Sequence, residues 1–316
     1  MTADEIQYRI CGAVLASAAA DTFGAPYEGG FMERALWVIL GRRQGKRRWT
    51  DDTAMSLDVI VSLLACGQVN QDDLARRFAR SYTWSRGYGR GAAKLLLRIR
   101  RGESWQSANR AVFPDGSYGN GGAMRAAPVG LFYSAGDEEK LVRAAKAAAA
   151  VTHAHPLGQE GAALIALTAA LSCRNLPHQE IIARLREHLQ SPEFQEKIDT
   201  AAAWLQADRP VSPQRAAAEL GNGIRSLDSC VTAVYIGLTL RNSPFSQLLR
   251  YIRNVGGDTD TIGAMAGAIW GAACGRQQLP DEYLHRLEQY ERLEKLAENF
   301  AEDIIRRPIV NCELSG

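Results

Sequence analysis

Two short acidic segments contain the side chains of this chain whose types and spacing suit binding of a metal ion. Residues 50–53 read Thr-Asp-Asp-Thr, residues 258–261 read Asp-Thr-Asp-Thr, and an apolar stretch follows each. Oxygen ligands of this kind suit hard divalent cations, and four carboxylates at neighbouring helix starts would repel one another without a cation between them. The two segments therefore predict one shared site for Mg²⁺ or Mn²⁺. Its carboxylates are those of Asp51, Asp52, Asp258 and Asp260.

Helix capping is the alternative explanation for both segments. Asp and Thr side chains accept hydrogen bonds from the free backbone N–H groups at a helix start. One cap needs one carboxylate, whereas each segment carries two, with threonines beside them. Metal binding is favoured, and capping stays open.

The elements that must position these segments are helices. After Thr53, apolar residues recur at helical spacing until Gly67 ends the run. Behind Asp260, glycines stand at every fourth position, at 263, 267, 271 and 275. An interior glycine costs about 1 kcal/mol relative to alanine, so close packing against another helix must compensate. The second segment is therefore expected to open a buried helix.

Helical periodicity continues along the whole chain, whereas strand signals are scarce. Short Pro, Gly or Asn turns separate the helical stretches, and no linker is long enough to divide them. We expect one all-α domain spanning residues 1–316. Its helices are predicted near 5–20, 53–66, 71–84, 90–101, 123–134, 138–151, 157–173, 178–190, 193–207, 213–221, 226–241, 245–254, 261–275 and 280–306.

Composition limits the possible partners. The 316 residues are 46% hydrophobic, which is ample for a large core, and the net charge of +2 gives no long-range attraction to nucleic acid or membranes. The six cysteines form no C-x-x-C pair, so we expect reduced thiols. No run has the length and apolarity of a membrane span, and the start lacks the basic residues of a secretion signal. A cytoplasmic protein, monomeric, is expected.

Glycine-rich turns supply a possible binding site. They lie at 86–91 and 116–122, with a further Gly-Gly pair at 29–30. Bare backbone N–H groups at a helix start can bind a phosphate, and Tyr88 or Tyr118 could stack on a base. Ordinary turn chemistry explains any one of these loops equally well. Two of them beside a metal site favour a nucleotide-like diphosphate ligand.

In this order along the chain, the motifs resemble those of the ADP-ribosylglycohydrolases, the family that includes dinitrogenase reductase activating glycohydrolase and the ADP-ribosyl-acceptor hydrolases. The resemblance spans nearly the whole length. The markers are the run from Gly12 to Asp21 with Gly24, Tyr27-Glu28, residues 50–53, residues 119–125, Thr152-His153 and residues 257–261.

The resemblance implies an orthogonal helical bundle with a central dinuclear cleft. The two Mg²⁺ or Mn²⁺ ions would be bound by Thr50, Asp51, Asp52, Asp258, Asp260 and Thr261. It also implies hydrolysis of a glycosidic bond with release of ADP-ribose from a modified acceptor. Glu28 would act as acid or base, assisted by Asp52 or Asp260. A structural role for Glu28 as an exposed loop residue stays open.

The substrate side of the site follows from the same resemblance. His153 would bind the ribose or phosphate, and whether His155 reaches the ligand is open. Loops 86–89 and 116–120 resemble the serine-type, O-linked hydrolases, whereas residues 152–156 resemble the arginine-type, N-linked members; O-linked acceptors are favoured. The expected binding residues are Gly87, Tyr88, Gly89, Gly91, Ser117, Tyr118, Gly119, Asn120, Gly122 and His153.

Three other interpretations remain. The basic stretch from Arg42 to Arg48 could attract an anionic target or nucleic acid, but a solvated flexible loop is the simpler expectation, and no nucleic-acid function is predicted. A non-catalytic descendant of the fold, structural or nucleotide-sensing, would not need the intact acidic set. A metal-dependent hydrolase of another sugar or phosphate is the third.

Overall fold

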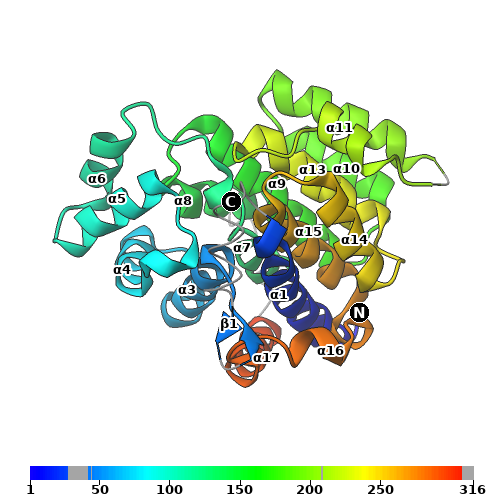
Figure 1. The fold of residues 1–316 in the computed structure, drawn as a ribbon, viewed down its shortest axis with the longest axis horizontal. Coiled ribbons are helices and arrows are strands. Elements are labelled where there is room, and N and C mark those ends of the chain that lie inside the picture. Colours follow the sequence, from blue (N-terminus) through cyan, green and yellow to red (C-terminus); the bar gives the residue numbers. More distant parts are fainter. Residues whose placement is uncertain (28–41, 44, 208, 308–316) are drawn as a thin grey trace, which may run out of the picture.

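The computed structural model describes residues 1–27, 42–43, 45–207 and 209–307. The fold is all-α, as the sequence predicts, and the helices pack around a buried central layer (Figure 1). The first half contains α1 (Ala3–Gly24), α3 (Asp51–Cys66), α4 (Gln71–Ser81), α5 (Arg90–Arg100), α6 (Trp105–Val112), α7 (Ala127–Phe132) and α8 (Glu138–Ala150). The second half contains α9 (Pro156–Cys173), α10 (His178–His188), α11 (Pro192–Leu205), α12 (Pro213–Glu219), α13 (Ser226–Thr239), α14 (Phe245–Val255), α15 (Thr259–Cys274), α16 (Asp281–Leu284) and α17 (Tyr290–Arg306).

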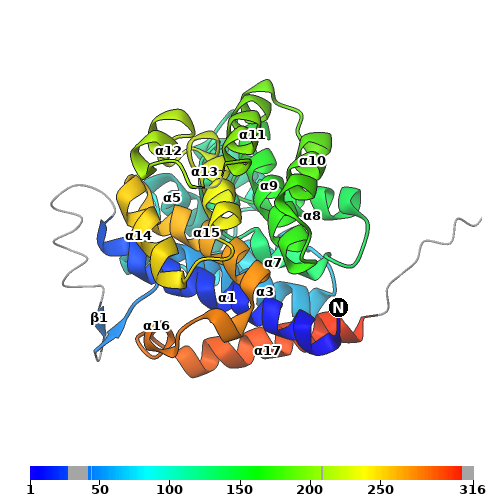
Figure 2. The same cartoon turned by 90° about the vertical axis from the view of Figure 1, so that its right-hand side faces the viewer.

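Helices α1 and α15 lie side by side at the centre of the molecule (Figures 1 and 2). Their glycines make the close contact possible: a Cβ atom on Gly12 would lie 2.6 Å from the Gly271 carbonyl oxygen, and one on Gly267 would lie 2.6 Å from the Ala16 oxygen. The predicted close packing of the glycine face is confirmed. The packing of this pair compensates for the helix propensity that the glycines lose.

Three helix ends meet as a result of this packing. Helix α1 ends near the point where α3 and α15 begin: the Thr50 N–H donates to Asp21 over 3.1 Å, and the Thr259 hydroxyl donates to the Gly24 backbone oxygen over 3.0 Å. The N-terminal ends of α3 and α15 carry partial positive charge and favour nearby carboxylates. At its other end α3 stops at Gly67, which adopts a left-handed φ of 69° as predicted for the end of this helix.

The structure differs from the predicted elements at three places. Helix α6 was not predicted, although Ser104 caps it by accepting a hydrogen bond from the Ser107 N–H. The predicted helix 123–134 is shorter, because Pro128 stands in the first turn of α7, where it lacks an N–H to continue an earlier helix. The predicted helix 280–306 is interrupted before Gln289, which has a φ of 51°.

Within the basic stretch, two short strands form where a solvated loop was expected. Strand β1 (Arg42–Arg43) pairs with β2 (Lys46–Arg47) in antiparallel fashion, and Gly45, with a φ of 78°, lies in the turn. The Arg47 N–H donates to the Arg286 oxygen over 2.6 Å, and the Glu288 N–H donates to the Arg47 oxygen over 2.9 Å. The two hydrogen bonds of Arg47 attach β2 to the segment that interrupts the last helix. The stretch therefore pairs with other backbone where a flexible loop was expected.

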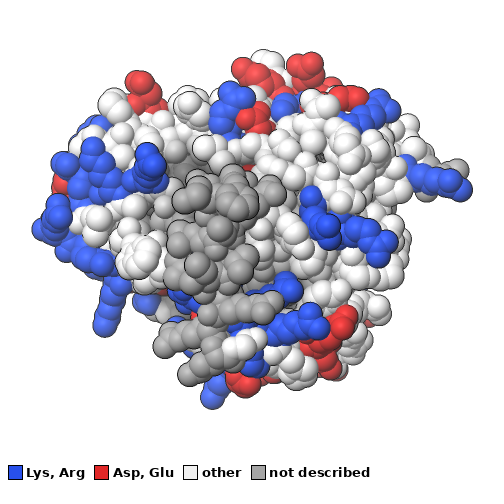
Figure 3. Space-filling model, viewed as in Figure 1, with Lys and Arg blue, Asp and Glu red and all other residues white. Residues whose placement is uncertain are grey.

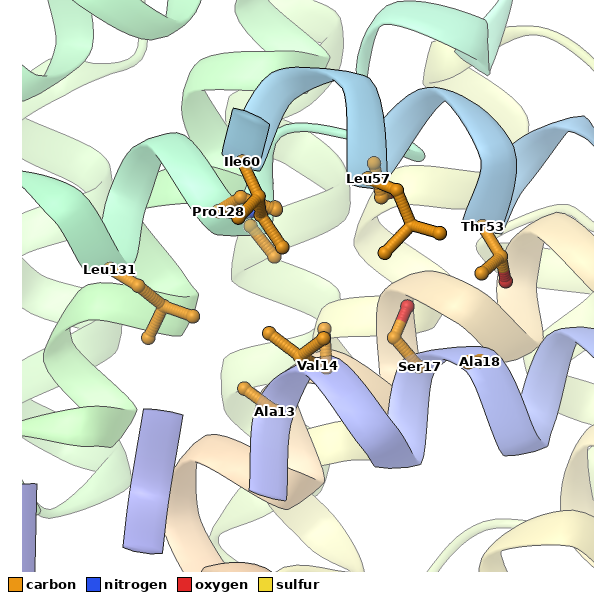
Figure 4. A pocket seen from close by; sticks show the side chains of 12 residues that line it. Ala13, Val14, Ser17, Ala18, Thr53, Leu57, Ile60, Pro128 and Leu131 are labelled. Atoms are coloured by element: carbon orange, nitrogen blue, oxygen red, sulfur yellow. The ribbon is translucent and has the colours of Figure 1, made fainter. Parts of the chain in front are cut away.

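An apolar pocket lies behind the first turns of α3. Figure 4 shows Val14 of α1, Leu57 of α3 and Leu131 of α7 around it, with Thr53 at one end. Such a lining offers little to a charged ligand. Among the described residues, no helix combines the length and apolarity required to cross a bilayer.

Candidate active site

The two acidic segments meet where the three helix ends come together. The Thr261 hydroxyl donates to Asp52 Oδ2 over 3.4 Å. Carboxylate oxygens of Asp21, Asp52 and Asp260 all lie within 4.8 Å of one another, and all three residues are buried. The two segments lie together, as expected, and a third helix, α1, adds a carboxylate to the cluster.

Asp21 is the residue that the sequence did not predict as part of the cluster. Its carboxylate accepts hydrogen bonds from the backbone N–H groups of Thr50 and Thr53, over 3.1 Å and 3.3 Å to Oδ2. Both threonine hydroxyls also donate to it. Asp21 thereby orients the first turn of α3. The available signal was an acidic residue inside a helix of small apolar residues, where an unpaired charge is costly to bury.

The electrostatics of the cluster fit a cation. Burial raises the pKa of Asp52 well above its ordinary value, and the charges of Asp21, Asp51 and Asp258 raise it further. Burial likewise raises the pKa of Asp21 to about 6, against the lowering effect of its hydrogen bonds to Thr53 and Thr50. The Asp52 Oδ1 atom is buried without a hydrogen-bond partner. A buried carboxylate oxygen without a partner, surrounded by like charges, is costly unless a cation binds it. Carboxylate oxygens and threonine hydroxyls together are the kind of ligands that a hard divalent ion prefers.

Asp258 is held by a residue that the sequence assigned to substrate. The Asn120 side-chain amide donates to Asp258 Oδ2 and, over 3.0 Å, to the Ser229 hydroxyl. The Asp258 N–H donates to the Asn222 oxygen over 2.8 Å. At the same helix start, Asp260 Oδ1 accepts from the Thr261 N–H over 2.8 Å. The carboxylates of the second segment are therefore held in fixed orientations.

A cleft with a volume of about 340 Å³, open to solvent, adjoins the cluster. This volume falls within the range of small-molecule binding sites. It brings together most of the residues that the sequence singled out. Those that line it are Asp51, Asp52, Gly87, Gly89, Gly91, Ser117, Gly119, Asn120, His153, Asp258, Asp260 and Thr261.

Two further predicted residues, Thr50 and Tyr88, do not line the cleft. Thr50 is buried, and its hydroxyl oxygen lies 2.8 Å from a carboxylate oxygen of Asp21 and 2.8 Å from one of Asp52. The Tyr88 ring packs edge-on against Tyr82, with 4.9 Å between centroids. Glu28, the predicted acid or base, is outside the described residues.

Tyr118 and Gly122 belong to the second glycine turn but do not line the cleft. Tyr118 is half-exposed, and its ring lies edge-on to His155 with centroids 5.6 Å apart. His155 caps α9, because its Nδ1 accepts from the Leu157 N–H over 3.2 Å. A Cβ atom on Gly122 would lie 3.0 Å from the Ala149 Cβ, so this glycine lets the turn pack against α8.

His153 is buried beside the turn 119–121 and is neutral. Burial, aided by the charge of Arg125, lowers its pKa to about 3. Arg125 is itself buried, and burial lowers the pKa of its guanidinium to about 10. It was not predicted as a site residue, although a charged residue three positions after a glycine turn and just before an apolar run was a usable signal.

An ion pair stabilises the chain where it enters α3. Arg86 and Glu288 form a buried salt bridge. Arg86 also donates to the Trp49 oxygen over 2.7 Å, and Glu288 accepts from the Trp49 N–H over 3.1 Å. The pair holds the residue that precedes Thr50, and the loop that follows Arg86 places Gly87 against Asp51, with 3.5 Å between a Cβ built on Gly87 and Asp51 Oδ1.

This chain is similar in sequence to known proteins. The profile of the ADP-ribosylglycohydrolase family matches residues 2–309. ADP-ribosylhydrolase ARH3 of Mus musculus is 35% identical over 284 residues, which cover 79% of this chain and 76% of the mouse protein. The Homo sapiens ARH3 is also 35% identical, over 79% of this chain and 77% of its own length.

Two further matches are more distant. The ADP-ribosyl dinitrogen reductase glycohydrolase of Rhodospirillum rubrum is 28% identical over 303 residues, which cover 91% of this chain and 93% of that protein. A solved structure described as an ADP-ribosylglycohydrolase-related protein complex superposes with a TM-score of 0.69 at 24% identity, over 95% of this chain and 99% of the other. The latter shares the fold.

Proposed function

Because this chain belongs to the ADP-ribosylglycohydrolase family, we propose that it is a metal-dependent hydrolase that releases ADP-ribose from ADP-ribosylated acceptors, with O-linked, serine-type acceptors favoured. One observation carries the proposal: the unpartnered oxygen of Asp52 lies in a buried acidic cluster that lines the same cleft as two glycine turns. The cluster suits a cation, and the turns suit a diphosphate.

The metal site of the proposal consists of Thr50, Asp51, Asp52, Asp258, Asp260 and Thr261, which would bind two Mg²⁺ or Mn²⁺ ions. Bound there, such ions orient sugar hydroxyls and lower the pKa of a water molecule. Asp21 and Asn120 support this set, since they hold the first turn of α3 and the Asp258 carboxylate.

The protein's own residues would stabilise the transition state of glycosidic bond cleavage. Cleavage of the glycosidic bond develops positive charge on the ribose ring, and the carboxylates of Asp52 and Asp260 offset that charge. The leaving oxygen of an O-linked acceptor needs a proton, because an alkoxide leaves less readily than a guanidine. Glu28 is the proposed acid or base for this transfer.

The cleft also offers groups for the anionic part of the substrate. Glycines of both turns and His153 line it, and so does Arg90. Figure 3 shows Lys and Arg side chains gathered over α5 and α6, next to this region. A surface of this charge favours the approach of a diphosphate.

The preference for O-linked acceptors rests on the loops at 86–89 and 116–120. Identity is also higher to the ARH3 proteins than to the Rhodospirillum rubrum glycohydrolase, 35% against 28%. Both observations support the serine-type, O-linked branch of the family.

Two peptides that differ only in linkage test the proposal. The protein is incubated with Mg²⁺ and a peptide ADP-ribosylated on serine or on arginine, and free ADP-ribose is followed. We expect release from the serine peptide, with little from the arginine peptide, and loss of release with chelator or in Asp51→Asn. Activity on the arginine-modified peptide alone would overturn the preference for O-linked acceptors. ADP-ribose binding without release from either peptide would indicate a non-catalytic descendant.

A further inference from the structure

A line of hydrogen bonds connects a buried cation to the histidine of the cleft. Arg125 donates from Nη2 to the Thr152 hydroxyl oxygen over 2.7 Å, and that oxygen lies 2.8 Å from His153 Nδ1. Arg125 also donates from Nη1 to the Gly121 oxygen over 2.7 Å. The glycine turn and the histidine are thus tied to one guanidinium.

The direction of each hydrogen bond follows from what each group can donate. A guanidinium has donors only, so the Thr152 oxygen accepts from Arg125. Among the described residues, the other hydrogen-bond partner of the Thr152 hydroxyl is His153 Nδ1, so the Thr152 hydrogen finds its acceptor there and Nδ1 accepts it. A neutral imidazole that accepts at Nδ1 carries its proton on Nε2. A second proton on the ring would replace the acceptor at Nδ1 with a donor and would place two cations near one another in the protein interior.

The protonated nitrogen faces the glycine turn of the cleft. A Cβ atom built on Gly119 would lie 3.3 Å from His153 Nε2, and one built on Gly121 would lie 3.0 Å from it. Both glycines and His153 line the cleft. Since neither glycine has a side chain, the space in front of Nε2 stays open.

We infer that Arg125 is a positioning residue which, through Thr152, holds His153 as the neutral tautomer with its proton on Nε2. In this form His153 presents a hydrogen-bond donor to an oxygen of the bound diphosphate or ribose. The inference rests on the proposed function for the identity of the ligand. The tautomer itself depends only on the three side chains.

Thr152→Val tests the relay while it leaves Arg125 and His153 in place. The variant keeps the shape of the side chain and removes the hydroxyl, and Thr152→Ser restores the hydroxyl. Thr168→Val is the matched control, because Thr168 is also a buried threonine, bonded only within its own helix to the Leu164 oxygen over 2.7 Å. A His153→Gln variant assigns the signal of His153 among the five histidines.

Nitrogen-15 NMR of the imidazole rings reads the tautomer directly. We expect a protonated Nε2 and an unprotonated Nδ1 in the wild type, Thr152→Ser and Thr168→Val, and a mixture of tautomers in Thr152→Val. Titration calorimetry with ADP-ribose should show affinity about tenfold weaker in Thr152→Val only. A proton on Nδ1 in the wild type, or an unchanged tautomer in Thr152→Val, would overturn the inference.

The two proposals fail in different ways. If the wild-type protein does not bind ADP-ribose, the proposed function fails, whatever the tautomer of His153. If Thr152→Val changes the tautomer but binds ADP-ribose with wild-type affinity, the relay exists without a role in binding, and the inference fails alone. Failure of Thr152→Ser to restore both readouts would also count against the relay.

Discussion

Thr261 donates its hydroxyl hydrogen to Asp52 Oδ2 over 3.4 Å, across 209 positions of sequence. This contact joins the starts of α3 and α15. Each helix start brings its own carboxylates, and the packing of both against α1 adds the carboxylate of Asp21. The charge that accumulates there is the physical basis for the first prediction.

Replacement of Asp52 by asparagine should abolish function without loss of the fold. Metal affinity should fall by at least about tenfold, and ADP-ribose release should fall with it. In the absence of metal the melting temperature should stay the same or rise, because a buried carboxylate among like charges is removed. Mg²⁺ should raise the melting temperature of the wild type by mass action, and it should raise that of the variant much less.

An equal Mg²⁺-induced shift in both proteins would contradict the prediction. The control is Asp199→Asn, which removes an exposed carboxylate on α11.

Asn120→Ala distinguishes metal support from substrate binding. Loss of the amide that donates to Asp258 should weaken Mg²⁺ or Mn²⁺ binding by about tenfold, as expected when a partner of a metal ligand is removed. Calorimetric metal titration measures it, with Ser229→Ala as a control that removes the other partner of the amide. Unchanged metal affinity with weaker ADP-ribose binding would instead support the substrate role predicted from sequence.

Asp58 should make stability depend on pH. Burial raises its pKa from 3.8 to about 6 in the folded protein, although Ser81 donates a hydrogen bond to it. Between these two values the folded state holds the proton more tightly than the unfolded state, so this contribution to stability is present at low pH and is lost as pH rises through about 6.

The Asp58→Asn variant removes this titration. At pH 7 its free energy of unfolding should exceed that of the wild type by about 2 kcal/mol, and the difference should shrink toward pH 4. Urea unfolding at several pH values measures both proteins. A difference that does not change with pH would show that Asp58 is not responsible.

Gly267→Ala tests the close contact between α1 and α15. The added Cβ would lie 2.6 Å from the backbone oxygen of Ala16, which cannot move without shifting α1. We expect a loss of about 1–3 kcal/mol of unfolding free energy, despite the better helix propensity of alanine. Gly136→Ala is the control, since its nearest neighbour is the Tyr133 oxygen at 3.5 Å, an ordinary contact. Equal stability of the two variants in denaturant titrations would contradict the prediction.

The parts of the site that the sequence predicted are those with a local signal. Thr50 caps the start of α3 with its side chain, Gly67 marks the end of that helix, and the glycines of α15 mark a close helix contact; Asp258 stands at the start of α15 without a capping hydrogen bond. Periodicity and capping act within a few residues, so they can be recognised before the fold is known. Where a longer-range contact competes, the same reasoning fails: pairing of Arg47 with the segment at 286–288 interrupts the helix expected over 280–306.

The tertiary structure decided which distant side chains support the local ones. Asp21 belongs to the acidic cluster, Asn120 holds Asp258, and Arg125 connects through Thr152 to His153. Each relationship depends on how helices pack, and a shift of one helix by a single turn would remove it while every local pattern stayed the same. For this protein, the sequence by itself determined where the helices carry acidic and glycine residues. The packing of α1, α3 and α15 decided that the acidic residues form a single cluster. The physical reason is that carboxylates so far apart in sequence meet only when the core brings their helix ends together.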